Sequence, residues 1–158
     1  MAAEFILERI YVKDLSFESP RSPEVFRSQW QPNVQLDIGS KTTPLGDDRF
    51  EVVLTVTASI RTPDAVTDAI VEVQQAGIFK LKGIPDEQRA RMLATFCPNI
   101  LFPYIRETVD TLMNKGGLPP LLLSPVNFES LYEEALKRRS EKPPSEVSAR
   151  SDKAQTEH

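Results

Sequence analysis

The chain has 158 residues, of which 40% are apolar and 27% charged, and its 19 lysine and arginine residues stand against 23 aspartate and glutamate residues. This length fits one domain with a core of its own, because domains commonly run to about 100–150 residues. The acidic excess argues against a nucleic-acid-binding protein, which needs clustered basic residues to neutralise phosphates.

The first half of the chain is predicted to form strands, because apolar and polar residues alternate there with the two-residue period of a strand. The stretches that alternate are Phe5–Glu18, Val34–Gly39, Phe50–Ile60 and Ala69–Gly77. Between the first two, Ser22-Pro23-Glu24 predicts a short helical turn with Ser22 as its N-cap.

Beyond Pro85 the apolar residues recur every three or four positions, which is the spacing of an amphipathic helix. Pro98 and Pro103 interrupt this run, so we expect a short helix before Cys97 and a long one after it. Gly116-Gly117 is expected to end the long helix.

Residues 118–125 are apolar and rich in proline, and they are predicted to be irregular. Asn127 is expected to cap a last amphipathic helix that includes Leu136. After Leu136 the apolar residues nearly stop, so residues 137–158 are predicted to be a disordered polar tail.

This order of elements indicates an α+β domain over residues 1–136. Strands followed by helices are typical of an antiparallel sheet, here four-stranded, with helices packed on one face.

The sequence offers little catalytic chemistry. It contains no glycine-rich phosphate-binding loop, and its one histidine is the terminal His158. Its one cysteine, Cys97, excludes an intrachain disulfide and a cysteine metal cluster. Cys97 could be a nucleophile near a helix start, but we interpret it as a buried structural residue because no internal histidine can activate it. We predict no enzyme and no cofactor or metal.

No apolar run approaches the roughly 18–20 residues that span a bilayer. The first residues also lack a basic region ahead of an apolar one. We therefore expect a cytoplasmic protein.

Four residues of the first and last strands are predicted to form an acidic patch with an apolar centre. Asp14 and Glu18 share a face of the first strand, and Ile70 and Glu72 lie on the outer face of the last strand. If these strands are neighbours, the patch suits a basic protein partner. A solvated sheet face without a partner is the simpler interpretation of the same residues.

Large apolar residues also occur in segments that are predicted to be irregular. Phe26 and Trp30 lie between two prolines, and Leu121 and Leu123 follow Pro119-Pro120. Such residues either seal the edge of the core or line a groove.

Five blocks of this sequence resemble, in order, the bacterial protein-export chaperone family SecB. The most distinctive is the run from Cys97 to Tyr104, with its two prolines. The blocks are Arg9–Glu18, Trp30–Pro32, Glu72–Gln75 with Gly77–Phe79, Cys97–Tyr104 and Leu123–Phe128.

The resemblance implies an ATP-independent cytoplasmic chaperone that holds unfolded precursor proteins and delivers them to SecA, the motor ATPase of the Sec translocase. It implies a Greek-key antiparallel sheet and a homotetramer, a dimer of dimers, with the long helix between dimers. Cys97, Ile100 and Tyr104 fall on that helix.

The resemblance also assigns the surface residues. Asp14, Glu18, Ile70 and Glu72 match the positions that receive the zinc-bearing C-terminal tail of SecA, so the zinc belongs to the partner. Client grooves in the family correspond approximately to Phe26, Trp30, Leu121 and Leu123. Two alternatives stay open, an enzyme that uses Cys97 and a SecB-like chaperone dedicated to one partner such as an antitoxin.

Overall fold

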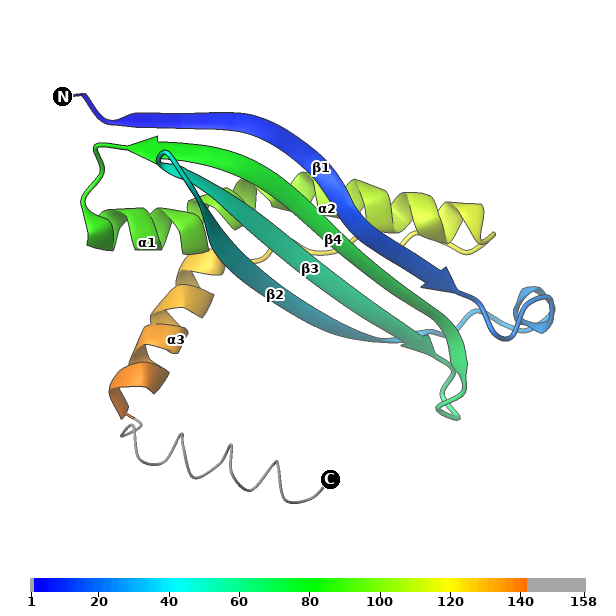
Figure 1. Ribbon diagram of the computed structural model, residues 1–158. Coiled ribbons are helices and arrows are strands. Elements are labelled where there is room, and N and C mark those ends of the chain that lie inside the picture. The colour runs from blue at the N-terminus through cyan, green and yellow to red at the C-terminus, as the bar shows by residue number, and fades with distance from the viewer. Residues whose placement is uncertain (1, 142–158) are drawn as a thin grey trace, which may run out of the picture. The chain divides into compact units, whose positions relative to one another are not determined.

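The structure, a computed structural model, describes residues 2–141, which form four strands, a short 3-10 turn and three α-helices (Figure 1). The contacts divide the chain into two compact units, one up to Val126 and one from Asn127 onwards. The elements are β1 (Glu4–Glu18), the 3-10 turn (Glu24–Phe26), β2 (Asn33–Gly46), β3 (Arg49–Arg61), β4 (Thr67–Lys82), α1 (Asp86–Ala94), α2 (Phe96–Lys115) and α3 (Phe128–Glu141).

The strands form one antiparallel sheet in the order β1-β4-β3-β2. β2, β3 and β4 follow one another as hairpins, whereas β1 is joined to β2 by a crossover and pairs with β4 (Figure 1). This arrangement is a Greek key, which confirms the predicted fold class. It leaves β1 and β2 as the two edges of the sheet.

The sheet has one face covered by helices and one outer face. Side chains on alternate positions of β3 and β4 are fully buried, and the residues between them are mostly polar and half-buried. Val56 and Val73 are register partners in the middle of the buried face. α2 packs on this face and contributes buried Leu101 and Ile105 to the core.

Two strands continue through glycines at which we expected them to end. Gly39 pairs with Thr55, and β2 runs on to Gly46, where Asp47 and Asp48 turn the chain with φ of 55° and 61°. Two positive φ values are typical of a two-residue hairpin loop, and aspartate tolerates them. The prediction that β2 ends at Gly39 is wrong, because the pairing with β3 continues without a register shift from Asn33 to Pro44.

Gly77 likewise lies inside β4, paired with Ile10 and Val52. A Cβ atom there would lie 2.8 Å from the Phe79 ring and 3.1 Å from Leu101 of α2. This glycine lets the helix approach the sheet and does not end the strand.

The helical region also begins differently from the prediction. α1 and α2 meet at Thr95, so α2 starts at Phe96 and includes Cys97, and Pro103 lies inside it. Pro98 falls in the first turn, where backbone N–H groups have no helical partner, and a proline there does not interrupt the helix. The end of α2 at Lys115, followed by Gly116-Gly117, agrees with the prediction.

The C-terminal end of α2 accommodates two aromatic rings from the first part of the chain. Phe17 lies where a Cβ atom of Gly116 would be, and Phe26 lies 3.0 Å from the Cβ position of Gly117. Phe17 is near the end of β1, and Phe26 follows in the crossover. The two glycines therefore let both segments approach the helix end closely.

The second unit contains α3, whose predicted cap is confirmed. The backbone N–H of Ser130 donates to Asn127 Oδ1 at 3.0 Å. α3 continues to Glu141, so residues 137–141 are helical and the predicted tail begins too early; the remainder of that tail, 142–158, and His158 with it, lies outside the described residues. None of the helices between residues 2 and 141 is long and apolar enough to cross a membrane.

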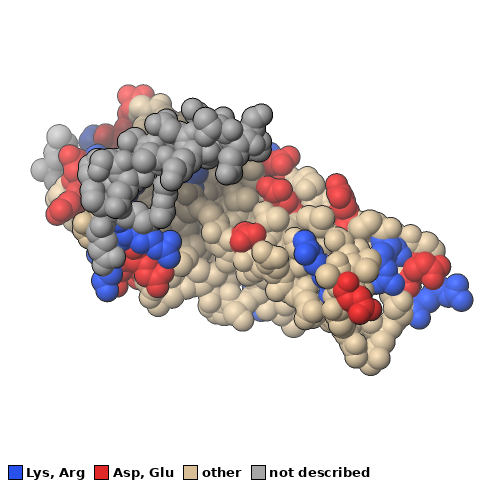
Figure 2. Space-filling model, turned by 90° about the horizontal axis from the view of Figure 1, so that it is seen from below, with Lys and Arg blue, Asp and Glu red and all other residues tan. Residues whose placement is uncertain are grey.

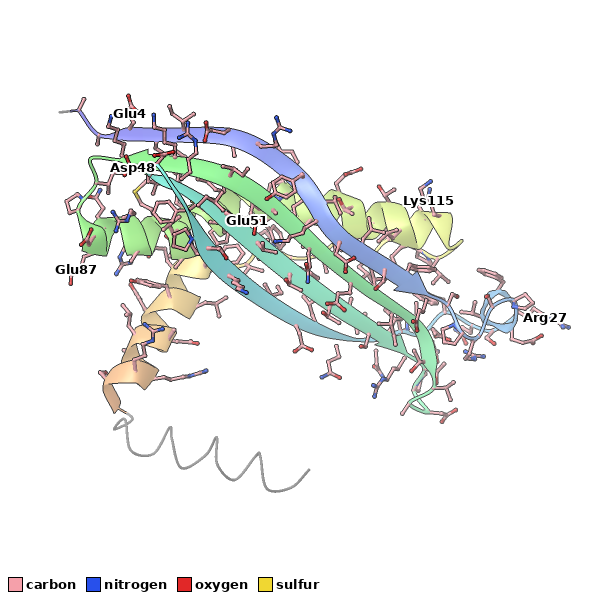
Figure 3. All side chains as sticks on the ribbon, in the orientation of Figure 1. Glu4, Arg27, Asp48, Glu51, Glu87 and Lys115 are labelled. Atoms are coloured by element: carbon pink, nitrogen blue, oxygen red, sulfur yellow. The ribbon has the colours of Figure 1, made fainter. Side chains whose placement is uncertain are left out.

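A polar network on the outer face connects β1 to β3 across β4. The Tyr11 hydroxyl and Lys13 Nζ both donate to the Glu51 carboxylate, the lysine at 2.8 Å. These bonds hold the pKa of Glu51 below its usual value. Burial, followed by the bond to Glu51, raises the pKa of Tyr11 to about 12. In Figure 3, Glu51 is seen near the middle of the outer face.

We expect Gly116→Ala to lower the free energy of unfolding by about 1–2 kcal/mol, because the added methyl group must displace the Phe17 ring. Urea unfolding measures the change. Gly39→Ala is the control, since nothing lies within 4 Å of its Cβ position. Equal stability of the Gly116 variant and the unaltered protein would contradict this packing.

We expect one of the three tyrosines to ionise late in an alkaline titration followed by phenolate absorbance. The pKa of Tyr11 rises from 10.0 to about 12, so its contribution to stability is complete below pH 10.0 and disappears as the pH passes about 12. Tyr11→Phe should remove this late phase, and Glu51→Gln should move it to lower pH. A Tyr11 phase unaffected by Glu51→Gln would argue against the hydrogen bond.

Candidate functional site

The four residues of the acidic patch lie together on the outer face, where the end of β1 meets the start of β4. Glu18 is the register partner of Ile70, and Ser16 is the partner of Glu72. Asp14 is opposite Gln74, on the same side of the sheet. The expected neighbourhood of the first and last strands is therefore confirmed, and Ile70 has Glu18 opposite it on β1 and Glu72 two residues along β4 on the same face.

The carboxylates of the patch differ from the other carboxylates of β1 in having no ion-pair partner in the described part of the chain. Within residues 2–141, neither Asp14, Glu18 nor Glu72 forms an ion pair. Towards the other end of β1 the carboxylates are neutralised. The pairs there are Glu4–Lys80 at 3.4 Å, Glu8–Arg49 at 2.6 Å and Glu51–Lys13 at 2.8 Å. Along β1, the carboxylates without an ion-pair partner among the described residues are thus those of the patch.

The crossover segment, residues 19–32, presents an aromatic side chain to solvent. Val25 is buried, whereas the next residue, Phe26, is 53% exposed. Trp30 is half-buried. The predicted N-cap is wrong: the Ser22 hydroxyl donates to Ser19 O instead, and no side chain caps the short turn.

The proline-rich segment, residues 118–126, is irregular as predicted and is held by one side chain of α2. Asp110 Oδ1 accepts hydrogen bonds from the backbone N–H of Leu121 at 2.9 Å and of Leu122 at 3.3 Å. Leu121 is half-buried and Leu122 is 62% exposed. Leu123 is only 5% exposed, so it seals the core and does not line an open groove.

A hollow of about 470 Å³ lies between α2 and this segment, where Phe102, Pro103 and Arg106 face Pro125. Two further residues named from the sequence, Ile100 and Tyr104, lie on α2, half-buried and exposed respectively. Cys97 is fully buried within the chain, so it offers no surface to a second copy. Burial also raises the pKa of its thiol to about 12, which leaves no thiolate nucleophile at neutral pH.

The structure adds apolar surface that the sequence analysis did not assign to a function. Val34 and Leu36 on the edge strand β2 are exposed, as is Leu122. β2 has only two charged residues, Asp37 and Lys41. Viewed from below, much of the middle of the visible surface is tan, and charged side chains gather towards its two ends (Figure 2). The alternation of Val34, Leu36 and Ile38 signals a strand but not that its apolar side chains are left exposed.

No three His, Cys, Asp or Glu side chains of residues 2–141 lie close enough together to hold a metal ion. The exposed features of the first unit described above are the acidic patch and the separate apolar segments. Both are typical of surfaces that bind other polypeptides.

Comparison with known proteins identifies the family. The family model described as preprotein translocase subunit SecB matches residues 1–139. A protein-export protein SecB of Hahella chejuensis is 52% identical over 135 residues, which are 85% of this chain and 84% of that protein. One of Pseudomonas syringae pv. tomato is 51% identical over 138 residues, 87% and 84% of the two chains.

The fold has a counterpart among solved structures. A SecB-like chaperone of Mycobacterium tuberculosis, in complex with a peptide from an antitoxin, superimposes with a TM-score of 0.61 at 21% identity. The match covers 77% of this chain and 90% of that one. From the family model and the close relatives, the chain belongs to the SecB family of protein-export proteins.

Proposed function

We propose that this protein is an ATP-independent chaperone that binds unfolded precursor proteins in the cytoplasm and delivers them to SecA for export. The single observation that supports this most strongly is that the protein-export relatives are about half identical to this chain over most of its length. The sheet then has two separate tasks, to receive SecA and to support the client-binding segments.

The acidic patch is the proposed docking site for the zinc-bearing tail of SecA. Glu18 lies opposite Ile70, Glu72 follows two residues along β4 and Asp14 lies further along the same face, and none of the three has an ion-pair partner among the described residues. A basic segment therefore gains charge attraction and an apolar contact in one place. Complementary charge accelerates encounter and sets orientation. The ion pairs along the rest of β1 leave this end as the negative target.

Client binding is proposed at the exposed apolar side chains of the crossover and proline-rich segments. Phe26, Trp30, Leu121 and Leu122 are at least partly exposed there. Burial of apolar surface yields about 25 cal/mol per Å² and needs no particular geometry, so unrelated unfolded chains can bind. Folded proteins have already buried such segments, and the chaperone therefore selects by folding state.

A homotetramer is proposed for the assembled protein. α2 exposes Phe96 and Tyr104. A second copy would bury these side chains, and several client surfaces in one assembly would raise the effective concentration of weak contacts.

A chaperone dedicated to one partner, such as an antitoxin, is the less favoured function. The antitoxin-bound neighbour shares only 21% of its residues with this chain, against about half for the export proteins. Proteins captured from a cell extract would distinguish a broad set of precursors from a single partner.

We expect charge reversal in the patch to separate the two activities. Asp14→Lys and Glu72→Lys should weaken SecA binding at least about tenfold through like-charge repulsion. Binding of a reduced, unfolded secretory precursor should not change, and stability should change by no more than about 0.5 kcal/mol. Titration calorimetry with SecA and with the precursor measures both affinities.

Glu87→Lys is the matched control, because it changes net charge equally on α1, away from the patch (Figure 3). It should leave both affinities unchanged. If the patch variants lose SecA and precursor binding together, the two-surface proposal is wrong. The folded form of the same precursor should not bind, and equal binding of both forms would refute selection by folding state.

A further inference from the structure

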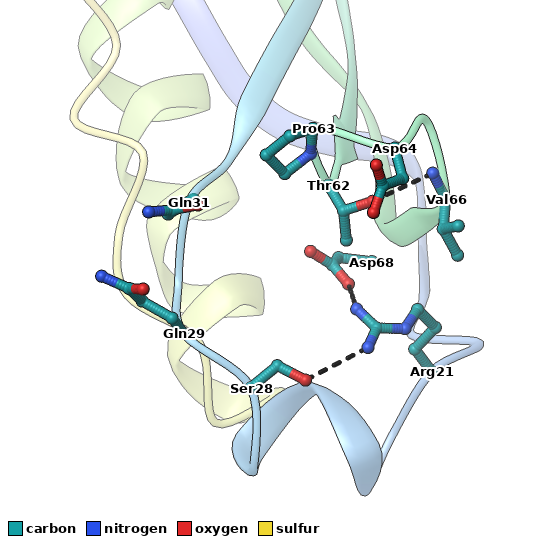
Figure 4. A pocket seen from close by; sticks show the side chains of 9 residues that line it. All are labelled: Arg21, Ser28, Gln29, Gln31, Thr62, Pro63, Asp64, Val66 and Asp68. Atoms are coloured by element: carbon teal, nitrogen blue, oxygen red, sulfur yellow. Dashed lines mark hydrogen bonds and ion pairs between the residues drawn. The ribbon is translucent and has the colours of Figure 1, made fainter.

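A nearly buried ion pair lies between the crossover segment and the start of β4. Arg21 Nη1 is 2.5 Å from Asp68 Oδ1, and the Asp68 side chain is only 5% exposed. The other guanidinium nitrogen, Nη2, donates to Ser28 Oγ at 3.2 Å. Figure 4 shows that this one guanidinium reaches both residues.

Arg21 encloses the short turn that presents Phe26. Its backbone oxygen accepts the N–H of Val25 at 2.9 Å, and its side chain holds Ser28, on the far side of the turn. The Ser28 hydroxyl in turn donates to Glu24 O at 3.2 Å. Residues 21–28 are thus closed into a loop, and Asp68 attaches that loop to the sheet.

The seam between this loop and the β3–β4 hairpin is not closed by packing. A cavity of about 280 Å³ separates Ser28, Gln29 and Gln31 from the hairpin residues Thr62–Val66 (Figure 4). Its lining is largely polar, so apolar burial does little to hold the loop at this side. The Arg21–Asp68 pair crosses the same seam.

We propose that Arg21 and Asp68 are positioning residues for client binding, which hold the crossover segment so that Phe26 and Trp30 are presented to an unfolded chain. The inference rests on the proposed function and adds to it residues that touch no client. Preorganisation is the physical reason, because an ordered segment does not lose conformational freedom again when the client binds. Without the pair, that loss is added to every binding event.

The test compares three variants of the full chain. Arg21→Met leaves the Asp68 carboxylate buried without its partner and should lower stability. Arg21→Met/Asp68→Leu removes both charges and should recover stability, because an apolar pair can replace a buried ion pair. Arg49→Met is the control, since it breaks the Arg49–Glu8 pair, remote from the crossover segment.

Both Arg21 variants should bind the reduced, unfolded precursor about tenfold more weakly, equivalent to about 1.4 kcal/mol, with SecA binding unchanged. Trypsin should also cleave them faster after Arg27, whose side chain is 79% exposed in the crossover segment. The Arg49 variant should match the unaltered protein in both assays. Cleavage at Arg27 reports the order of the segment directly, so it separates positioning from overall stability.

A stable double variant with unaltered precursor affinity and unaltered cleavage at Arg27 would overturn the inference. So would an equal loss of SecA binding, since the pair would then support the whole end of the sheet. If the unaltered protein itself ignores the unfolded precursor, the proposed function fails instead. The cleavage rate at Arg27 would still decide whether the pair holds the segment.

Discussion

The pairing of β1 with β4 is the constraint on which both proposed surfaces depend. It places Glu18 beside Ile70, and so creates the acidic patch from residues that lie far apart in the sequence. The same pairing directs the chain out of the sheet at the end of β1, so the next residues must cross to reach β2 on the opposite edge. That crossover carries Phe26 and Trp30. One strand register therefore sets the proposed docking patch and the starting point of the proposed client-binding segment.

Charge on the outer face is organised by pairing as well as by position. Acidic side chains occur along most of β1, and those at its start are matched by Lys80 and Arg49, while Glu51 binds Lys13 and Tyr11. Surface ion pairs contribute little stability, typically about 0–1 kcal/mol each. Their larger effect here is to compensate the carboxylates at the start of β1 and leave those of the patch unpaired within residues 2–141. This distribution supports the proposal that a basic partner docks at one end of the strand instead of spreading along it.

Local pattern was sufficient for the type and order of the elements and for the shared face of Asp14 and Glu18, because strand alternation assigns faces. It did not show that β1 and β4 are neighbours, on which the patch depends. Sequence pattern was not sufficient where the surroundings of a residue decide whether a strand ends or a side chain is buried. Gly39 and Gly77 look like strand ends, but one lies at an open edge and the other beneath a helix. Leu123 resembles a groove residue and is buried, whereas its neighbour Leu122 is exposed. The Arg21–Asp68 pair joins residues that only the folded β1–β4 register brings together, so no sequence period reveals it.

A passive chaperone needs surfaces that are apolar yet do not collapse onto its own core. The crossover segment meets this requirement by dividing neighbouring side chains, since Val25 enters the core while Phe26 is left exposed. A ring that is 53% exposed has packing contacts on one side only, so the position of its backbone depends on what lies beneath it. Two contacts hold the segment. Gly117 lets the Phe26 ring pack closely at the end of α2, and Asp68 binds Arg21. Contacts beneath the segment thus allow its apolar surface to stay exposed and ordered at the same time.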